Sequence, residues 1–435
     1  MLQDAFTRFL GVLENSERAP RSDLLRYQQR LVAQLVCHAY EHVSFYRDRL
    51  ACLFGADGRL DLSRWGEVPL VTRAEALIAG NAMRTPELPA IYGPITEIKT
   101  SGSTGQPLRI ASNALNFLAA NAALVRLARW WGIDASRPLA KIVINEADEI
   151  PAYPEGRERD TWSYGDRRAP IFELDLSTPI EQQIEWLRRK KAPYLMTLPS
   201  NAVALSYAVA PEQARELGIE VIFAIGETVL PQARKFIAER FGARLVAIYS
   251  CQEVGLIATQ CPTSTDYHMV VENCVVEILR DNGTPALPGE YGQVVVTGFY
   301  NYAMPFIRYS IGDVATVGRN FCSCDRSLPL IAQIDGRTRH AFVFRDGTRV
   351  WPRPLNFSVS EFVACREYQL AQLDRERIEF RYVPDGSGRA PDHAGLDAYI
   401  KQKIHPSAEV LLAPMQSIPR GPGGKLTPFI SMVID

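Results

Sequence analysis

Between residues 139 and 250, short apolar runs alternate with amphipathic stretches, and this alternation limits the fold more than any other feature of the chain. The runs at 140–144, 221–225 and 245–249 have the length and the aliphatic content of buried strands. The stretch Pro231 to Phe241 predicts a helix between the last two runs, with proline near its start. Strands that alternate with helices favour a layered α/β domain.

The sequence on the C-terminal side of this region predicts two further units. Residues 270–317 alternate strand-like runs with turns, which indicates a β-rich subdomain. After Gly336 the pattern changes again, and residues 375–435 alternate strand and helix over a short length. We therefore expect a boundary near residues 336–340, followed by a small α+β unit.

The composition excludes several partners. The chain has 435 residues and a net charge of -1, so we expect neither a nucleic acid nor a membrane surface as partner. The most apolar long stretch, 117–132, contains Arg126 and Arg129, which disfavours a membrane span. The N-terminus has no export signal and the eight cysteines lack the dense spacing of a secreted scaffold. A cytoplasmic location is the expectation.

A loop rich in hydroxyl groups lies between two strand-like segments. It runs from Thr100 to Pro107, after the alternating segment 95–100 and before the short run 108–111, and a helix is expected from about 114 to 131. Its two glycines permit a tight turn, and its four hydroxyls and free amides can bind anionic oxygens. The loop lacks the Gly-Lys-Ser/Thr of a Walker loop. Taken alone, such a loop is also compatible with an ordinary turn.

Four soft metal-ligand side chains form a second constellation. Cys261 and His268 are separated by six residues, and Cys322 and Cys324 by one, so two loops offer the donors for one tetrahedral structural zinc. The alternative is that these cysteines are free side chains of the core or of loops.

With the stretches that follow it in order, the Thr100–Pro107 loop resembles the phosphate-binding signature of the adenylate-forming superfamily of acyl-CoA synthetases, adenylation domains and luciferases. Those stretches are Gly226-Glu227-Thr228, Tyr249 to Glu253, Tyr309 to Asp313, Gly336-Arg337, and Pro419 to Lys425. Leu198-Pro199-Ser200, the modest length and the cysteine pattern are similar to the phenylacetate–CoA ligase-like branch, whose members often carry such a zinc set.

The resemblance implies a fold and a reaction. It implies a large N-terminal α/β domain over residues 1–335, a hinge over 336–340 and a small mobile C-terminal domain over 341–435. The implied reaction is the ATP-dependent and Mg²⁺-dependent activation of a carboxylic acid as an acyl-adenylate, followed by transfer to CoA with release of AMP. A homodimer is a further family-level expectation.

The resemblance also implies residue roles. Lys425 would contact the carboxylate and the α-phosphate, and Glu253 would hold Mg²⁺. Thr104 belongs to the catalytic loop, and Asp313 would accept hydrogen bonds from the ribose hydroxyls. The nucleotide would also contact Ser101, Gly102, Ser103, Thr104, Gly105, Gly226, Glu227, Tyr249, Ser250, Ile334 and Arg337.

Departures from the family pattern leave the acyl acceptor open. Gln106 stands where a lysine is common, and Gly336-Arg337-Thr338 is followed by Arg339 where the hinge motif commonly has aspartate. An amide ligase with an amine acceptor is therefore the alternative to a CoA ligase. A nucleotide-binding protein without activity and a zinc-stabilised interaction module are further alternatives, which the intact loop, Glu253, Asp313 and Lys425 disfavour.

Overall fold

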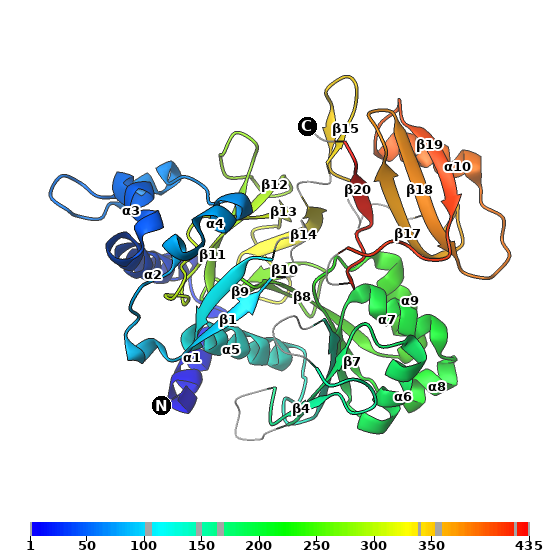
Figure 1. Ribbon diagram of the computed structural model, residues 1–435, viewed down its shortest axis with the longest axis horizontal. Coiled ribbons are helices and arrows are strands. Elements are labelled where there is room, and N and C mark those ends of the chain that lie inside the picture. The colour runs from blue at the N-terminus through cyan, green and yellow to red at the C-terminus, as the bar shows by residue number, and fades with distance from the viewer. Residues whose placement is uncertain are drawn as a thin grey trace.

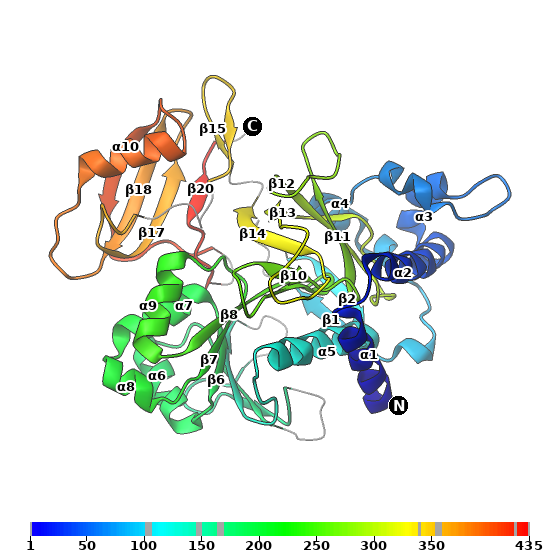
Figure 2. The same cartoon turned by 180° about the vertical axis from the view of Figure 1, so that it is seen from behind.

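In the computed structural model, the chain forms a large N-terminal lobe and a smaller C-terminal lobe, whose first strand begins at Phe342 (Figure 1). The structure describes residues 2–100, 107–144, 150–162, 169–337, 341–352, 359–421 and 424–433. The same two lobes are seen from behind in Figure 2, with α6 to α9 below the C-terminal lobe. The mixed α/β class predicted from the sequence is confirmed.

The α/β part of the large lobe is built on five parallel strands in the order β8-β7-β6-β3-β5. Alternate residues of each strand face opposite helical layers, so that Ile222 packs with α6 to α9 and Phe223 packs on the side of α5. The elements are α5 (Ala114–Trp130), β3 (Leu139–Val143), β4 (Arg157–Arg159), β5 (Ile171–Asp175), α6 (Ile180–Lys190), β6 (Tyr194–Thr197), α7 (Pro199–Ala208), α8 (Pro211–Glu216), β7 (Val221–Ala224), α9 (Pro231–Phe241) and β8 (Arg244–Cys251).

An antiparallel region extends the same sheet beyond β8, in the order β8-β9-β10-β14-β13-β12-β11. Its strands are β9 (Gly255–Gln260), β10 (Tyr267–Met269), β11 (Cys274–Leu279), β12 (Tyr291–Gly298), β13 (Tyr309–Val317) and β14 (Leu330–Arg337). Strands β11 to β13 form the β-rich part expected from residues 270–317, and β9, β10 and β14 extend this part beyond the expected bounds. The turn between β8 and β9 lies where the two halves of the sheet meet.

Most of the N-terminal helices cover the antiparallel region and share a core with its strands, whereas the first helix packs against α5 in a separate core. They are α1 (Leu2–Ser16), α2 (Arg21–His42), α3 (Ser44–Leu50) and α4 (Arg73–Ala79), with the short 3₁₀ helices η1 (Ala51–Leu53), η2 (Leu62–Glu67), η3 (Gly80–Met83) and η4 (Ala90–Tyr92). A hairpin of β1 (Ile95–Lys99) and β2 (Arg109–Asn113) follows. The hydroxyl-rich loop therefore joins two antiparallel strands, as the sequence predicted.

The C-terminal lobe has its own four-stranded sheet, in the order β19-β18-β17-β20, and its own hydrophobic core. Its elements are β15 (Phe342–Val343), β16 (Arg349–Val350), β17 (Cys365–Gln372), β18 (Arg377–Pro384), α10 (His393–Lys403), β19 (Glu409–Pro414) and β20 (Phe429–Ser431). The alternation of strand and helix expected here is confirmed. Of the predicted hinge, residues 336 and 337 end β14, and residues 338–340 lie outside the described residues.

Burial decides two local features of the large lobe. Helices α2 and α3 are separated at Val43, which is buried in an extended conformation that suits a β-branched residue. Asn113 precedes α5 but its side chain does not cap the helix. That amide instead donates to the carbonyl of Tyr300 (2.9 Å) and accepts from the N–H of Tyr302 (2.8 Å), because the residue is fully buried.

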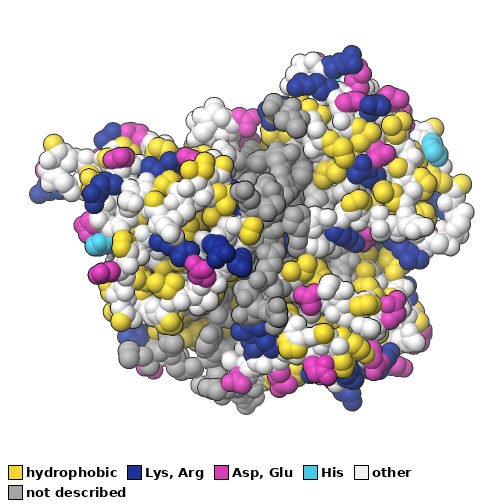
Figure 3. All heavy atoms as spheres, viewed as in Figure 1, with side chains coloured by type: hydrophobic (Ala, Val, Ile, Leu, Met, Phe, Trp, Pro, Cys, Tyr) yellow, Lys and Arg dark blue, Asp and Glu magenta, His cyan; other side chains and the backbone are white. Residues whose placement is uncertain are grey.

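Among the described residues, no helix is long and apolar enough to cross a membrane. On the face shown in Figure 3, basic and acidic side chains are interspersed among the described residues, and neither sign forms a continuous surface. This distribution fits the near-zero net charge.

Candidate functional site

The candidate site lies around the carboxyl ends of the parallel strands, the usual position of ligand sites in open α/β sheets. Gly226 and Glu227 follow β7, Ser200 lies in the first turn of α7 just after β6, and Glu253 occupies the turn after β8. Thr100, directly after β1, and the end of the β13–β14 pair supply further polar groups. Segments far apart in sequence therefore meet at one end of the sheet.

Three of the predicted nucleotide-binding residues, Asp313, Arg337 and Tyr249, form one connected group. Asp313 and Arg337 lie opposite each other on β13 and β14, and their Oδ1 and Nε atoms are 2.9 Å apart. The hydroxyl of Tyr249, on β8, donates to Oδ2 of Asp313 at 2.8 Å. The Asp313 carboxylate raises the pKa of Arg337, and burial together with Asp313 raises the pKa of Tyr249 well above its ordinary value. The phenol therefore stays protonated and acts as a hydrogen-bond donor.

Glu253 is held at the base of the β1–β2 loop. It is only 6% exposed and accepts a hydrogen bond from the hydroxyl of Tyr309 at 3.0 Å. Arg73 lies 3.9 Å from the same Oε1 atom and donates to Oγ1 of Thr100 at 2.8 Å. The Thr100 hydroxyl also accepts a hydrogen bond from the N–H of Leu108, so the residues that flank the loop are bonded to each other. The carboxylate and the start of the loop are thus tied together by one guanidinium.

The C-terminal lobe brings Lys425 to the turn after β7. A Cβ atom on Gly226 would lie 3.3 Å from Cε and 3.5 Å from Nζ of Lys425, so the absence of a side chain at Gly226 gives the lysine its place. The backbone of Gly226 also has a φ of +76°, a conformation that suits glycine. Glycine at this position therefore serves both the turn and the approach of the lysine.

Glu227 joins the two lobes at the same place. Its Oε2 accepts from the N–H of Ser200 and its Oε1 from the hydroxyl of Ser200, both at 2.9 Å. The backbone N–H of Leu426 also donates to Oε1. Burial raises the pKa of Glu227, against the opposing effect of these donors.

The remaining predicted residues differ in how far the structure places them. Ser101, Gly102, Ser103, Thr104 and Gly105 lie outside the described residues. Ser250 is exposed on β8, and Ile334 is partly buried on β14 against the core of the antiparallel region. Burial raises the pKa of Cys251 well above its ordinary value, which argues against a thiolate nucleophile at that position.

The predicted zinc ligands form a second site, distinct from the nucleotide residues. The donor atoms of Cys261, His268, Cys322 and Cys324 all lie within 4.8 Å of one another. The two closest pairs are Cys261 Sγ to Cys322 Sγ at 3.4 Å and His268 Nε2 to Cys324 Sγ at 3.2 Å. The other ring nitrogen of His268 lies 3.4 Å from the carbonyl oxygen of Leu328. A ring that donates from Nδ1 leaves Nε2 available as a ligand.

Sequence reasoning missed residues that complete the first site. Arg73 stands just after the Thr72 that caps α4, Tyr309 begins β13, and Ser200 is the second residue of α7. Tyr309 and Ser200 fall within or beside the stretches that carry the resemblance, so their position was a usable signal. Arg73 is a single arginine far from every motif, and only the three-dimensional structure reveals its contacts.

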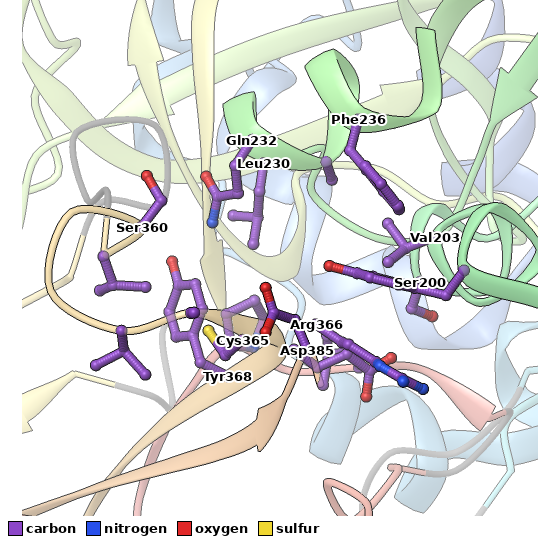
Figure 4. Close-up of a pocket in the computed structure, with 18 of the residues that line it drawn as sticks. Ser200, Val203, Leu230, Gln232, Phe236, Ser360, Cys365, Arg366, Tyr368 and Asp385 are labelled. Carbon is purple, nitrogen blue, oxygen red and sulfur yellow. The ribbon is translucent and has the colours of Figure 1, made fainter. Parts of the chain in front are cut away.

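A cavity of about 450 Å³ separates the two lobes beside Glu227. Figure 4 shows Val203, Leu230 and Phe236 from the large lobe facing Cys365 and Tyr368 from the C-terminal lobe. Gln232 and Arg366 add polar groups to opposite walls, and the Arg366 guanidinium lies 5.1 Å from the ring centroid of Tyr207. The interface between the lobes is therefore incompletely filled.

Comparison with known proteins identifies the fold of the chain. No protein-family model matches the chain. A crystal structure of 2-hydroxyisobutyryl-CoA ligase in the postadenylation state matches with a TM-score of 0.74 and 20% identity, over 95% of this chain and 91% of the ligase. The chain thus has the fold of the adenylate-forming CoA ligases.

Sequence comparison finds relatives that match nearly the whole chain. The phenylacetate–coenzyme A ligase of Thermus thermophilus is 25% identical over 94% of this chain and 97% of the relative. The ligase of the same name from Escherichia coli is 25% identical over 94% and 95%. The chain is therefore a homologue of the phenylacetate–CoA ligases.

A second structure of the same ligase also matches the chain. The same 2-hydroxyisobutyryl-CoA ligase in its thioesterification state gives a lower TM-score, 0.63, with 22% identity over 96% of this chain and 91% of the ligase. The fold is therefore matched by both structures of that ligase.

Proposed function

We propose that this chain is an AMP-forming acid–CoA ligase, which activates a carboxylic acid as an acyl-adenylate and passes the acyl group to CoA. The observation that carries the proposal is the approach of Lys425, from the C-terminal lobe, to Gly226 at the carboxyl ends of the parallel strands. A cation delivered there by a separate lobe suits a reaction that concentrates negative charge in its first step and must then admit a second substrate.

In the first step, a carboxylate oxygen of the acid attacks the α-phosphorus of ATP and the bond to pyrophosphate breaks. Lys425 stabilises the charge that develops on the carboxylate and the α-phosphate. Asp313, oriented by Tyr249 and Arg337, accepts hydrogen bonds from the ribose hydroxyls. Residues Ser101 to Gly105 bind the phosphates in this proposal, and Ser250, Gly226 and Ile334 border the nucleoside.

Glu253 is the residue that would hold Mg²⁺. A buried carboxylate linked through Arg73 to Thr100, where the proposed phosphate-binding loop begins, is a suitable hard oxygen ligand. Arg73 at 3.9 Å is too distant to occupy it with a short hydrogen bond. When bound, the ion would neutralise phosphate oxygens as the pyrophosphate leaves.

In the second step, the sulfur of CoA attacks the acyl carbonyl, the bond to AMP breaks, and the thiol proton passes to solvent. In this arrangement of the two lobes, the Lys425 side chain lies against the turn after β7. We therefore propose that residues 341–435 move as a lid relative to residues 1–335, about a hinge at 336–340.

The test is pyrophosphate release from ATP and Mg²⁺ over a panel of aryl, arylacetic and aliphatic acids, with and without CoA. We expect acid-dependent release that Lys425→Ala reduces by about a hundredfold or more, and a CoA-dependent rise with a thioester product. An amine-dependent rise with an amide product would assign the acceptor to the alternative class. Absence of both release and ATP binding across the panel would overturn the proposal.

We also propose that Cys261, His268, Cys322 and Cys324 hold one structural zinc ion. The donor set and its compactness fit a closed tetrahedral site, in which no position remains for a substrate. The ion would tie the loop between β9 and β10 to the loop before β14. Because thiolate ligands of this kind persist in a reducing compartment, the site fits the cytoplasmic location expected from the sequence.

The zinc proposal is tested by metal analysis of the purified protein after exhaustive dialysis. We expect one zinc per chain, lost in Cys322→Ser and kept in Cys365→Ser, whose thiol lies in the other lobe. Because the ring of Trp130 is 5.4 Å from that of His268, removal of the ion should also change the tryptophan fluorescence. Wild-type protein without zinc would contradict the proposal.

We also propose that the protein is a homodimer. Light scattering should give about twice the chain mass of 48.6 kDa, and a single-chain mass would remove this part alone.

A further inference from the structure

The hydrogen bonds that Glu227 accepts from Ser200 and Leu426 form one connected group that joins the two lobes. We call this group the Glu227 latch. Ser200 and Glu227 belong to the large lobe, on α7 and on the turn after β7, whereas Leu426 belongs to the C-terminal lobe. One carboxylate accepts two donors from Ser200 and one from the Leu426 backbone. The Leu426 bond exists only while the C-terminal lobe is in this position.

The latch acts on the residue next to the predicted catalytic lysine. Leu426 follows Lys425 directly, so fixing the Leu426 amide also fixes the backbone from which the lysine side chain extends. The segment is further constrained because the N–H of Gly421 donates to the carbonyl of Lys425 at 2.9 Å. The turn is thus anchored at both ends of the Lys425 peptide unit.

Other contacts also cross this interface, among them the Arg366 guanidinium over the ring of Tyr207. The cavity of about 450 Å³ lies between α7, α9 and the β17–β18 pair, and both Glu227 and Leu426 line it. Because the space is unfilled, apolar packing between the lobes is incomplete there, although Leu230 of the large lobe packs against the C-terminal core. The polar latch is therefore well placed to decide how long the C-terminal lobe stays in this position.

We propose that Glu227 is a positioning residue, which holds the Lys425 segment over the site for the first step and must release Leu426 before the second. This inference rests on the proposed two-step function. An interaction made in only one arrangement of the lobes shifts the equilibrium toward that arrangement. The latch therefore favours adenylate formation relative to acyl transfer.

The carboxylate is the group that this role requires. A glutamine at this position has one acceptor oxygen and an NH₂ group, and the NH₂ would face a donor from Ser200 or from Leu426. Loss of a hydrogen bond to a charged acceptor changes an equilibrium by about ten- to a hundredfold. Glu227→Gln is therefore a small change in shape with a large expected effect on the lobe equilibrium.

The experiment measures the two steps separately in Glu227→Gln. Adenylate formation is followed with ATP and the best acid of the panel, and acyl transfer with presynthesised acyl-adenylate and CoA. We expect the ratio of the first rate to the second to fall about ten- to a hundredfold. Asp385→Asn is the matched control, because Asp385 lines the same cavity but binds the N–H of Ser387 in its own lobe. Its ratio should stay within about twofold of wild type, as expected for a surface-type change.

A second measurement needs no turnover. Hydrogen exchange of the peptide that contains Leu426 should be faster in Glu227→Gln than in wild type or Asp385→Asn, without any ligand. Equal loss of both rates in Glu227→Gln, or unchanged exchange, would overturn the inference. If the wild type forms no acyl-adenylate at all, the proposed function fails, and the exchange experiment still decides whether the latch exists.

Discussion

A buried ion pair between Arg126 and Glu272 gives a prediction whose size follows from the structure. Arg126 on α5 and Glu272 before β11 are each about 1% exposed, and Nη1 lies 2.7 Å from Oε1. The same Nη1 donates to the carbonyl of Leu13 at 3.1 Å, and the Ser16 hydroxyl contacts Glu272. Among the described residues, Nε and Nη2 of Arg126 and Oε2 of Glu272 have no hydrogen-bond partner. The pair thus attaches α1 to the rest of the large lobe, although these three polar atoms form no hydrogen bond with the described residues.

Removing one member should therefore cost more than removing both. Glu272→Gln leaves a guanidinium buried without its counter-charge, a change that costs about 3–5 kcal/mol. The double variant Arg126→Met/Glu272→Leu replaces both charges with apolar groups and should restore most of that loss. The hydroxyl of Ser16 already lies 2.9 Å from the carbonyl of Leu13, so that carbonyl keeps a donor in the double variant.

The assay is native-state hydrogen exchange of α1, together with the thermal midpoint. A cost of 3 kcal/mol or more predicts exchange at least about a hundredfold faster in α1 of Glu272→Gln. The double variant should exchange within about tenfold of wild type, corresponding to about 1.4 kcal/mol. If Glu272→Gln is as stable as wild type, or if the double variant is less stable than either single variant, the reasoning about uncompensated charge fails.

Further predictions concern the site and its frame. Asp313→Asn should raise the KM for ATP by about tenfold or more, because it removes the charge that faces Arg337 at 2.9 Å, and an ATP titration measures this. Gly424→Ala should slow adenylate formation, since φ is +68° and the new Cβ would lie 2.9 Å from Cδ2 of Leu176; Gly388→Ala, with φ of +74° and open space around it, is the control in the same rate assay. Burial would raise the pKa of Glu173, but Lys141, Arg157 and Arg159 outweigh it and lower the pKa. Its stabilising contribution is therefore complete above about pH 5 and is lost as the pH falls through the folded pKa, so Glu173→Gln should flatten the acid limb of a stability curve against pH.

Much of the architecture was predictable because its signals are local. The helix predicted over Pro231 to Phe241 has the bounds of α9, and the loop from Thr100 joins a hairpin as its flanking alternation indicated. The zinc donors also meet as expected, because each lies on a short loop or strand beside the others. These features depend on periodicity, on proline placement and on the close spacing of ligand residues.

The features of the fold and the site that the sequence did not predict depend on contacts between distant segments. Nothing near Arg73 in the sequence indicates that its guanidinium joins Thr100 to Glu253. The break at Val43 and the use of Asn113 by Tyr302 reflect burial, which overrides the helical pattern and the capping preference. The bond from Leu426 to Glu227 likewise spans the two lobes and leaves no local trace.

The most direct test of the proposed chemistry uses an acid labelled with ¹⁸O in its carboxylate. If a carboxylate oxygen attacks the α-phosphorus of ATP, one labelled oxygen must remain on the AMP when CoA takes the acyl group. We therefore predict AMP that carries one ¹⁸O, formed in step with the thioester and absent in Lys425→Ala. Unlabelled AMP, or label in ADP or inorganic phosphate, would contradict an acyl-adenylate intermediate.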